Sequence, residues 1–245
     1  MRISRSHASR RLMALGLSVM AAGSVVLLGA GDSAARARGS FSDSFTHPRA
    51  NPYFPLTPGL VLRYRGTDGP DRFQEQVVVT NQTKMIEGVR ATVVRDVLRR
   101  TDGSIAELTH DWYANDNKGN VWYLGEATAT YRRNGQLESR EGSWEAGVKG
   151  ARAGQIMPAS PRPTDAYRQE YWRGHAEDQA WIVQNQANIT VPNGTYHHVV
   201  RSYEWSRLEK ANVSVKFYAR GLGIVAEHDV AGGSENFKLV GVTRP

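Results

Sequence analysis

The segment DWYANDNKGNVWYLGE, residues 111–126, decides the fold class, because it has the composition of a β-hairpin. Aromatic residues and Val, which favour strands, flank the cluster NDNKGN, whose Asn, Asp and Gly residues are typical of a tight reversal. The segment predicts two paired antiparallel strands, Trp112 to Ala114 and Val121 to Leu124, joined by a turn over residues 115–120. We expect Trp122 to be largely buried and Asn117 to lie at an exposed tip. A calcium loop is not expected here, because neither possible register places Gly at the sixth position.

The remainder of the chain repeats this pattern. Short alternating runs rich in β-branched residues recur along it, and Asn-Gly pairs at residues 134–135 and 193–194 are strong hairpin signals. The sequence predicts an all-β fold, a single antiparallel meander that curls into a barrel or half-barrel, with a β-sandwich as the alternative. At most one or two short helices are expected, the best candidate being residues 175–186. Residues 142–163 are expected to form the longest loop.

The N-terminus has the features of an export signal. Four arginines within the first 11 residues precede an apolar run over residues 12–30, and Ala35-Arg36-Ala37 fits a cleavage site. We therefore expect a signal peptide over residues 1–37, a flexible leader over residues 38–52, and one β domain over residues 53–245. An uncleaved N-terminal anchor is the alternative, and the Sec and twin-arginine routes both remain open. The predicted location is secreted or associated with the cell envelope.

Charge and cysteine content exclude several classes of protein. The chain has 31 basic and 24 acidic residues, but residues 1–37 hold five Arg and one Asp, which leaves 26 basic against 23 acidic residues in the remainder. No block of like charge remains, so a nucleic-acid partner is not expected. The chain has no cysteine, which excludes disulfides, thiolate metal sites and a cysteine nucleophile. No nucleotide, zinc or serine-hydrolase motif is present, and we expect no cofactor and no bound metal.

Three segments of the chain resemble a family of exported bacterial proteins that has no established function. They are DWYANDNKGNVWYLGE, GSWEAGVKGARAGQIMPASP and YRQEYWRGHAEDQA. The resemblance extends over most of the chain, from NPYFPLTPG to GLGIVAEHDV, although Asn115 and Thr164 depart from the family's usual Gln and Gly. It implies an exported location and no particular activity. A weaker likeness to curved-sheet envelope proteins implies an apolar ligand.

The same three segments supply the candidate ligand-binding residues, which are aromatic or acidic: Trp122, Glu126, Trp144, Glu145, Glu170, Tyr171, Glu177 and Asp178. Strict alternation along the second strand of the hairpin would place Glu126 on the same face as Trp122 and Leu124. Paired carboxylates can perform general acid/base catalysis or hold a divalent cation. The alternative is that these acids form salt bridges with arginines such as Arg132, Arg168 or Arg173. No catalytic residue is assigned.

Three functions agree with these observations. The first is a non-catalytic exported binding protein whose cleft, lined by Trp and Tyr, holds a small apolar or glycan ligand. The second is a hydrolase that uses two of the carboxylates, with or without a metal. The third is a structural or interaction module of the envelope, which would show an exposed apolar patch in place of a cleft.

Overall fold

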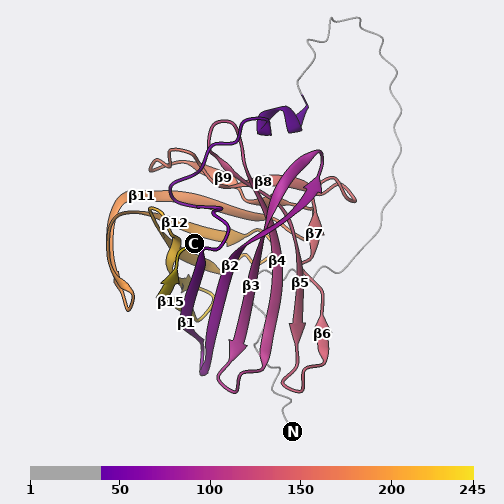
Figure 1. The fold of residues 1–245 in the computed structure, drawn as a ribbon. Coiled ribbons are helices and arrows are strands. Elements are labelled where there is room, and N and C mark those ends of the chain that lie inside the picture. The colour runs from indigo at the N-terminus through magenta and orange to yellow at the C-terminus, as the bar shows by residue number, and fades with distance from the viewer. Residues whose placement is uncertain (1–39) are drawn as a thin grey trace, which may run out of the picture.

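The computed structural model describes residues 40–245, and the expected signal peptide, residues 1–37, lies outside them. The described residues form an all-β fold with one short 3-10 helix (Figure 1). The elements in chain order are η1 (Phe41–Phe45), β1 (Val61–Asp68), β2 (Asp71–Ile86), β3 (Val89–Arg100), β4 (Ile105–Asn115), β5 (Val121–Tyr131), β6 (Leu137–Ser139), β7 (Trp144–Glu145), β8 (Arg152–Met157), β9 (Ala166–Arg168), β10 (Glu170–Tyr171), β11 (Asp178–Val191), β12 (Gly194–Ser206), β13 (Val213–Ala219), β14 (Gly223–Ala231) and β15 (Glu235–Thr243).

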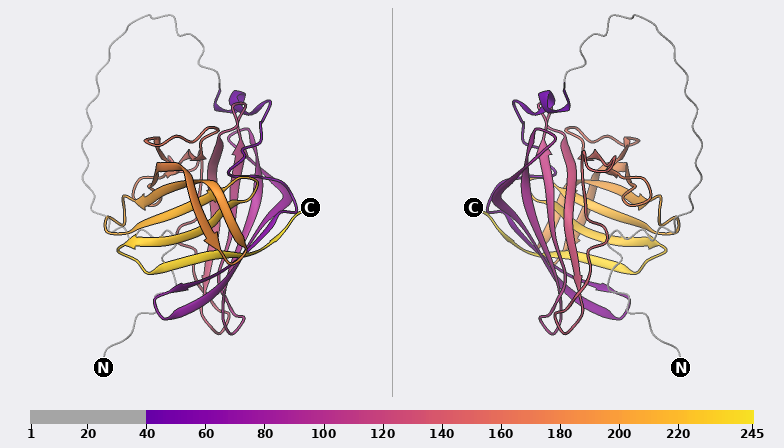
Figure 2. Two further views of the ribbon diagram at one scale, coloured as in Figure 1. Left: turned by 90° about the vertical axis from the view of Figure 1, so that its left-hand side faces the viewer. Right: turned by 90° about the vertical axis from the view of Figure 1, so that its right-hand side faces the viewer.

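All the strands belong to one antiparallel sheet that coils on itself. Its order is β10-β8-β5-β4-β3-β2-β1-β15-β14-β13-β12-β11-β9, and β6 and β7 both pair with β5. The strands β11–β15 cross β1–β5 at a large angle, and they lie in front of them in the left view of Figure 2. The two ends of the order approach each other, since β9 contacts β8 and β10 contacts β11. The sheet is therefore a nearly closed barrel, which confirms the expected meander.

Alternation along each strand explains why the sheet curls around a core. In β1, Leu62 and Tyr64 are buried while Arg63 and Arg65 are exposed, so every second side chain points inward. The inward side chains of β1 join those of β2, β12 and β15 in one core cluster that includes Phe237. Burying a large apolar side chain contributes about 1.5–3 kcal/mol, and many strands contribute such residues, which offsets the absence of disulfides.

The expected hairpin at residues 111–126 is confirmed. Ala114 of β4 lies opposite Trp122 of β5, and the turn closes with the Gly119 amide donating to the Asp116 carbonyl at 3.0 Å. Trp122 is only half-buried, because it lies on the outer face of the sheet. Asn117 is not a free tip, since its side-chain amide donates to the Asp43 carbonyl at 3.1 Å.

The segment before β1, which belongs to the leader expected from the composition, packs against the β domain. Over residues 40–52 it lies along the β4–β5 turn, and the rings of Phe41 and Phe45 pack edge-on against Trp122, with centroids 5.4 and 6.3 Å away. Buried Asn51 donates to the carbonyls of Gly119 and Pro158 at 2.8 and 2.9 Å. The apolar residues and Asn51 in this polar segment find partners only in the folded domain, which the local composition does not reveal.

Two expectations of local structure are wrong. Residues 175–186, the best candidate for a short helix, are not helical: residues 178–186 form part of β11, where buried Ala180 and Ile182 alternate with exposed Trp181. A period of two is the signature of a strand, and pairing with β12 outweighs local helix propensity. Residues 142–163 contain β7 and β8 instead of one long loop. Within residues 40–245, no helix has the length and apolar character needed to span a membrane.

Candidate functional site

The interior of the nearly closed barrel contains a cavity of about 250 Å³. Part of its wall is apolar and comes from the segment before β1 and from strands β1, β2, β3, β8, β14 and β15. These lining residues are Phe54, Leu56, Leu60, Leu62, Val77, Val79, Val94, Ile156, Leu222, Ile224 and Phe237. A concave space with an apolar wall and a limited set of polar groups is the usual form of a small-molecule site.

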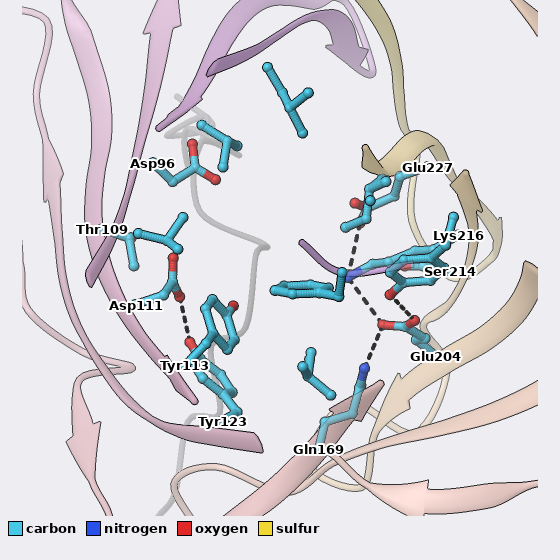
Figure 3. Close-up of a pocket in the computed structure, with 18 of the residues that line it drawn as sticks. Asp96, Thr109, Asp111, Tyr113, Tyr123, Gln169, Glu204, Ser214, Lys216 and Glu227 are labelled. Carbon is cyan, nitrogen blue, oxygen red and sulfur yellow. Dashed lines mark hydrogen bonds and ion pairs between the residues drawn. The ribbon is translucent and has the colours of Figure 1, made fainter. Parts of the chain in front are cut away.

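The rest of the wall is strongly acidic. Lys216 is the one basic side chain among the described residues that line the cavity. Two polar groups face each other across the space, one around Asp111 and one around Glu204 and Lys216 (Figure 3). The acidic lining residues are Glu75, Asp96, Glu107, Asp111, Glu126, Glu170, Asp178, Glu204, Glu209, Glu227 and Glu235.

Strand alternation places the first polar group. Glu107, Thr109, Asp111 and Tyr113 are every second residue of β4, and all four line the cavity. The hydroxyl of Tyr123 donates to Asp111 Oδ1 at 2.7 Å. Burial raises the pKa values of Tyr113 and Tyr123 well above their ordinary range, and the carboxylates of Asp111 and Glu126 raise them further. Both tyrosines are therefore neutral hydrogen-bonding groups.

A β-bulge in β5 corrects the expected face of Glu126. Tyr113 pairs with Tyr123 and Trp112 with Gly125, so Leu124 is an extra residue in β5. One extra residue reverses the alternation beyond it, and Glu126 thus faces the cavity together with Tyr123 instead of sharing a face with Trp122 and Leu124.

Glycine is required at this bulge. Gly125 has φ of 136°, and a Cβ at this position would lie 2.3 Å from the Trp144 carbonyl oxygen and 2.9 Å from the Glu145 Cα. Those backbone atoms belong to β7, which pairs with β5 here. The close approach of β7 therefore depends on the absence of a side chain at Gly125.

Glu126, Glu170 and Asp178 form a cluster of carboxyl groups, which we call the carboxyl trio. Burial raises the pKa of Glu126 well above its ordinary range, and the charges of Asp111 and Glu107 raise it further. Burial, then Asp178 and Glu126, raise the pKa of Glu170 in the same way. Burial also raises the pKa of Asp178, to about 6, against the lowering effects of Ser206 and Lys216. The protonation of each group therefore depends on the protonation of the other two.

Glu204, which lies across the cavity from Asp111 (Figure 3), is a fully satisfied carboxylate. Although burial alone would raise its pKa, the Lys216 ammonium and three neutral donors hold the pKa of Glu204 below its usual value. Lys216 Nζ lies 3.1 Å from Glu204 Oε2 and 3.8 Å from Glu227 Oε1. The neutral donors are Tyr218 at 2.6 Å, Ser202 at 2.7 Å and Gln169 at 2.9 Å.

Of the eight candidate residues expected from the sequence, Glu126, Glu170 and Asp178 line the cavity. Trp144 is buried directly behind this wall, where it pairs with Glu126 across β5 and β7. The other four candidates are not among the described residues that line the cavity: Trp122, Glu145, Tyr171 and Glu177. Trp122 and Glu145 have partners elsewhere, the latter Lys84 at 2.7 Å.

Tyr171 and Glu177 also have partners away from the cavity wall. Arg168 stacks over the Tyr171 ring at 4.5 Å, and Glu177 accepts from the Gly174 amide at 2.9 Å. The aromatic lining expected from tryptophan is therefore supplied mostly by tyrosine and phenylalanine, with Trp205 as the tryptophan among the described lining residues.

Sequence reasoning missed most of the polar wall, including Asp111, Glu204 and Lys216. One signal was available in β4, where the polar side chains Glu107, Thr109 and Asp111 recur at every second position. Such a stripe in a strand indicates a polar inner surface. The pairing of Glu204 with Lys216 depends on the register of β12 against β13, which no local pattern reveals. Among residues 40–245, no group of three or more His, Asp or Glu side chains has a geometry that could hold a metal ion.

The fold and the cavity together define the class of protein. It is a nearly closed antiparallel barrel whose internal cavity has an acidic wall and an apolar wall. No family model and no curated protein matches the chain, so the resemblance to a family of exported bacterial proteins stays a prediction. Two solved structures are similar to it. A proposed exported protein with YmcC-like fold from Bacteroides fragilis has 12% identity and a TM-score of 0.46 over 80% of this chain and 100% of that chain. A proposed lipoprotein from Parabacteroides distasonis has 14% identity and a TM-score of 0.44 over the same shares.

Proposed function

We propose that this protein is an exported, non-catalytic binding protein that encloses a small ligand in the half-barrel cavity. The observation that carries the proposal is the division of one cavity into an apolar wall and a polar wall. Such a division orients a ligand that has an apolar body and a polar end. The basic and apolar N-terminus supports export.

An apolar ligand fits the lining better than a glycan. Sugar sites rely on exposed aromatic faces, but Trp122 packs against η1 and Trp144 is buried behind the wall. The aliphatic residues of β1 and β2 instead offer a continuous apolar surface next to Phe237. Of the two ligand classes expected from the sequence, the apolar one is therefore the one we propose.

The test is ligand retention combined with a blocked cavity. Native mass spectrometry of protein purified from its own host should show a retained small molecule, and a lipid panel should raise the melting temperature. Val77→Phe, which fills the cavity from β2, should abolish both effects. Val78→Phe is the matched control, because the next residue of the same strand is not among those that line the cavity. Equal behaviour of the two variants, or no ligand with either assay, would overturn the proposal.

A hydrolase is the second candidate, and the carboxyl trio is the observation that favours it. A carboxyl group whose pKa is raised by burial can act as a general acid near neutral pH. Turnover of ester or glycoside substrates that is lost in Glu170→Gln but retained in Glu141→Gln, a change at an exposed residue, would favour the hydrolase. Ligand binding without turnover favours the binding protein.

A further inference from the structure

We infer that the carboxyl trio is the binding site for a primary ammonium group, so that the ligand is a cationic amphiphile whose apolar body lies on the aliphatic wall. The inference rests on the proposed binding function and specifies the chemical class of its ligand. In this arrangement Glu126, Glu170 and Asp178 bind the charged end of the ligand. The strands β1 and β2 contact its alkyl chain.

Glu170 gives the first argument. Its side chain lines the cavity and is 2% exposed. Asp178 and the Trp144 indole lie close enough to affect its pKa, but neither carboxyl oxygen of Glu170 reaches good hydrogen-bond geometry with a described residue. Oδ1 of neighbouring Asp178 is also buried without a partner there. Leaving a buried polar group unsatisfied is costly, and native proteins rarely tolerate it without a functional reason. Donors supplied by a ligand would satisfy these oxygens.

The distribution of charge gives the second argument. Lys216, the basic side chain among the described lining residues, is held between Glu204 and Glu227 at 3.1 and 3.8 Å. Lys216 also lowers the pKa of Asp178 through its charge, but burial outweighs this effect and raises the pKa of every member of the carboxyl trio. The Lys216 ammonium thus compensates Glu204 enough to lower its pKa, but it does not compensate the carboxyl trio to the same extent.

The chemistry of the ammonium group gives the third argument. A primary ammonium has three N–H donors and no acceptor, so it can donate to more than one of these carboxyl groups. Hydrogen bonds between ionised partners are roughly twice as strong as neutral ones. A neutral hydroxyl offers one donor and cannot compensate the negative charge. A carboxylate or phosphate would be repelled by the acidic wall.

The two walls adjoin in one space. The rings of Tyr113 and Tyr123 stack on each other, and both tyrosines line the same cavity as the trio and the aliphatic residues. A ligand of this class therefore places its ammonium at the trio and its alkyl chain against side chains such as Leu62 and Val77 without leaving the cavity.

The test is isothermal titration calorimetry with a matched alkyl series, in which octylamine, octyltrimethylammonium, octanol and octanoate differ only in the polar end. Octylamine should bind at least about tenfold more tightly than each of the others. Because binding would ionise neutral carboxyl groups, octylamine should also release protons, so that its binding enthalpy differs between phosphate and Tris buffers at one pH. Equal affinities of octanol and octylamine, or a preference for octanoate, would overturn the inference and leave the proposed binding function standing.

Three variants test whether the preference for octylamine over octanol depends on the carboxyl trio. Glu170→Gln and Asp178→Asn, tested separately, should each lower the affinity for octylamine toward that of octanol while leaving octanol binding unchanged. Glu141→Gln, the same chemical change at an exposed residue, should keep the full preference. If the amine preference survives in both trio variants, the site is elsewhere and the inference fails. If no member of the series binds and no ligand is retained from the host, the proposed function itself fails.

Discussion

Glu170 and Asp178 face one another across the seam at which the sheet closes. Glu170 belongs to β10, the first strand of the sheet order, whereas Asp178 belongs to β11, next to the last strand. The chain between them turns back, and the Gln169 amide donates to the Asp178 carbonyl at 2.8 Å. Two carboxyl groups from opposite ends of the sheet thus meet inside the cavity, where burial raises the pKa of both.

This arrangement predicts that Asp178→Asn stabilises the protein at neutral pH. The folded state raises the pKa of Asp178 from 3.8 to about 6, so it binds more protons than the unfolded chain within this interval. The stability that the group contributes is complete below about pH 4 and is lost as the pH rises through about 6. Asparagine does not ionise and therefore avoids this loss. The free energy of unfolding of the variant should exceed that of the wild type by on the order of 2 kcal/mol at pH 8 and by almost nothing at pH 4.

Urea unfolding from pH 4 to pH 8 measures this effect. Glu170→Gln should change the free energy of unfolding in the same direction, because burial raises the pKa of Glu170 as well. Glu141→Gln, at an exposed position, should change it by less than about 0.5 kcal/mol at every pH. Destabilisation by Asp178→Asn at pH 8 would show that the ionised carboxylate is compensated in the folded protein.

Much of the fold could be predicted because its signals are local. The hairpin of β4 and β5 follows from strand-forming residues around an Asn, Asp and Gly cluster, and the meander follows from repeated alternation. Residues 175–186, the candidate for a short helix, form a strand from residue 178 onward instead, because the alternation of Ala180 and Ile182 with Trp181 favours a strand more than the weak helix propensity favours a helix. The contacts of η1 with Trp122 join residues about 80 positions apart, and composition does not encode such contacts.

The site could be predicted only in part, since it depends on register. Glu126, Glu170 and Asp178 stand out in the sequence as acids near aromatic residues, but their common cavity follows from the bulge in β5 and the closure of the sheet. A one-residue shift of register reverses the face of every later side chain. Glu204 and Lys216 were missed because each is ordinary within its own strand and becomes an ion pair only across β12 and β13.

Gly125→Ala should destabilise the protein strongly, since the bulge leaves no space for a side chain. Its Cβ would meet the Trp144 carbonyl at 2.3 Å while φ is 136°, and we expect a loss of about 3 kcal/mol or more. Gly135→Ala is the matched control, because Gly135 also has a positive φ of 80° but no atom lies within 4 Å of the place that its Cβ would occupy. Its loss should be about 1 kcal/mol. Similar losses for the two variants in urea unfolding would mean that backbone strain, and not the approach of β7, explains the glycine.

Asp116→Ala should also be costly, because this buried carboxylate organises the β4–β5 turn. Its oxygens accept from the amides of Lys118 and Asn120 at 2.8 and 2.9 Å, from Asn120 Nδ2 at 2.7 Å and from the Trp122 indole at 3.0 Å. Although burial alone would raise its pKa, these hydrogen bonds hold the pKa of Asp116 below its usual value. Removing the acceptor should cost about 2–4 kcal/mol.

The control for this turn is Lys118→Ala. Lys118 is exposed, and only its backbone amide takes part in the bonds to Asp116. Thermal or urea unfolding should show a change below about 0.5 kcal/mol. A loss at Lys118 as large as that at Asp116 would contradict the assignment of the turn's stability to the carboxylate.

Lys216→Met should destabilise the protein at neutral pH by about 3 kcal/mol, because it leaves buried Glu204 without its cation at 3.1 Å. In the wild type the pKa of Glu204 is lowered, so its contribution is present above the unfolded pKa of a glutamate and is lost as the pH falls through the folded pKa. In the variant, burial is no longer opposed by the ammonium, and Glu204 should take up a proton at a higher pH than before.

The deficit of Lys216→Met relative to wild type should therefore be largest near pH 8 and shrink toward pH 4 in urea unfolding, because a protonated Glu204 no longer needs a cation. The double variant Lys216→Met with Glu204→Gln removes both charges and should recover most of the loss at pH 8. A deficit that is independent of pH, or a double variant that is less stable than Lys216→Met alone, would show that Lys216 stabilises the cavity wall through packing instead of through its ion pair with Glu204.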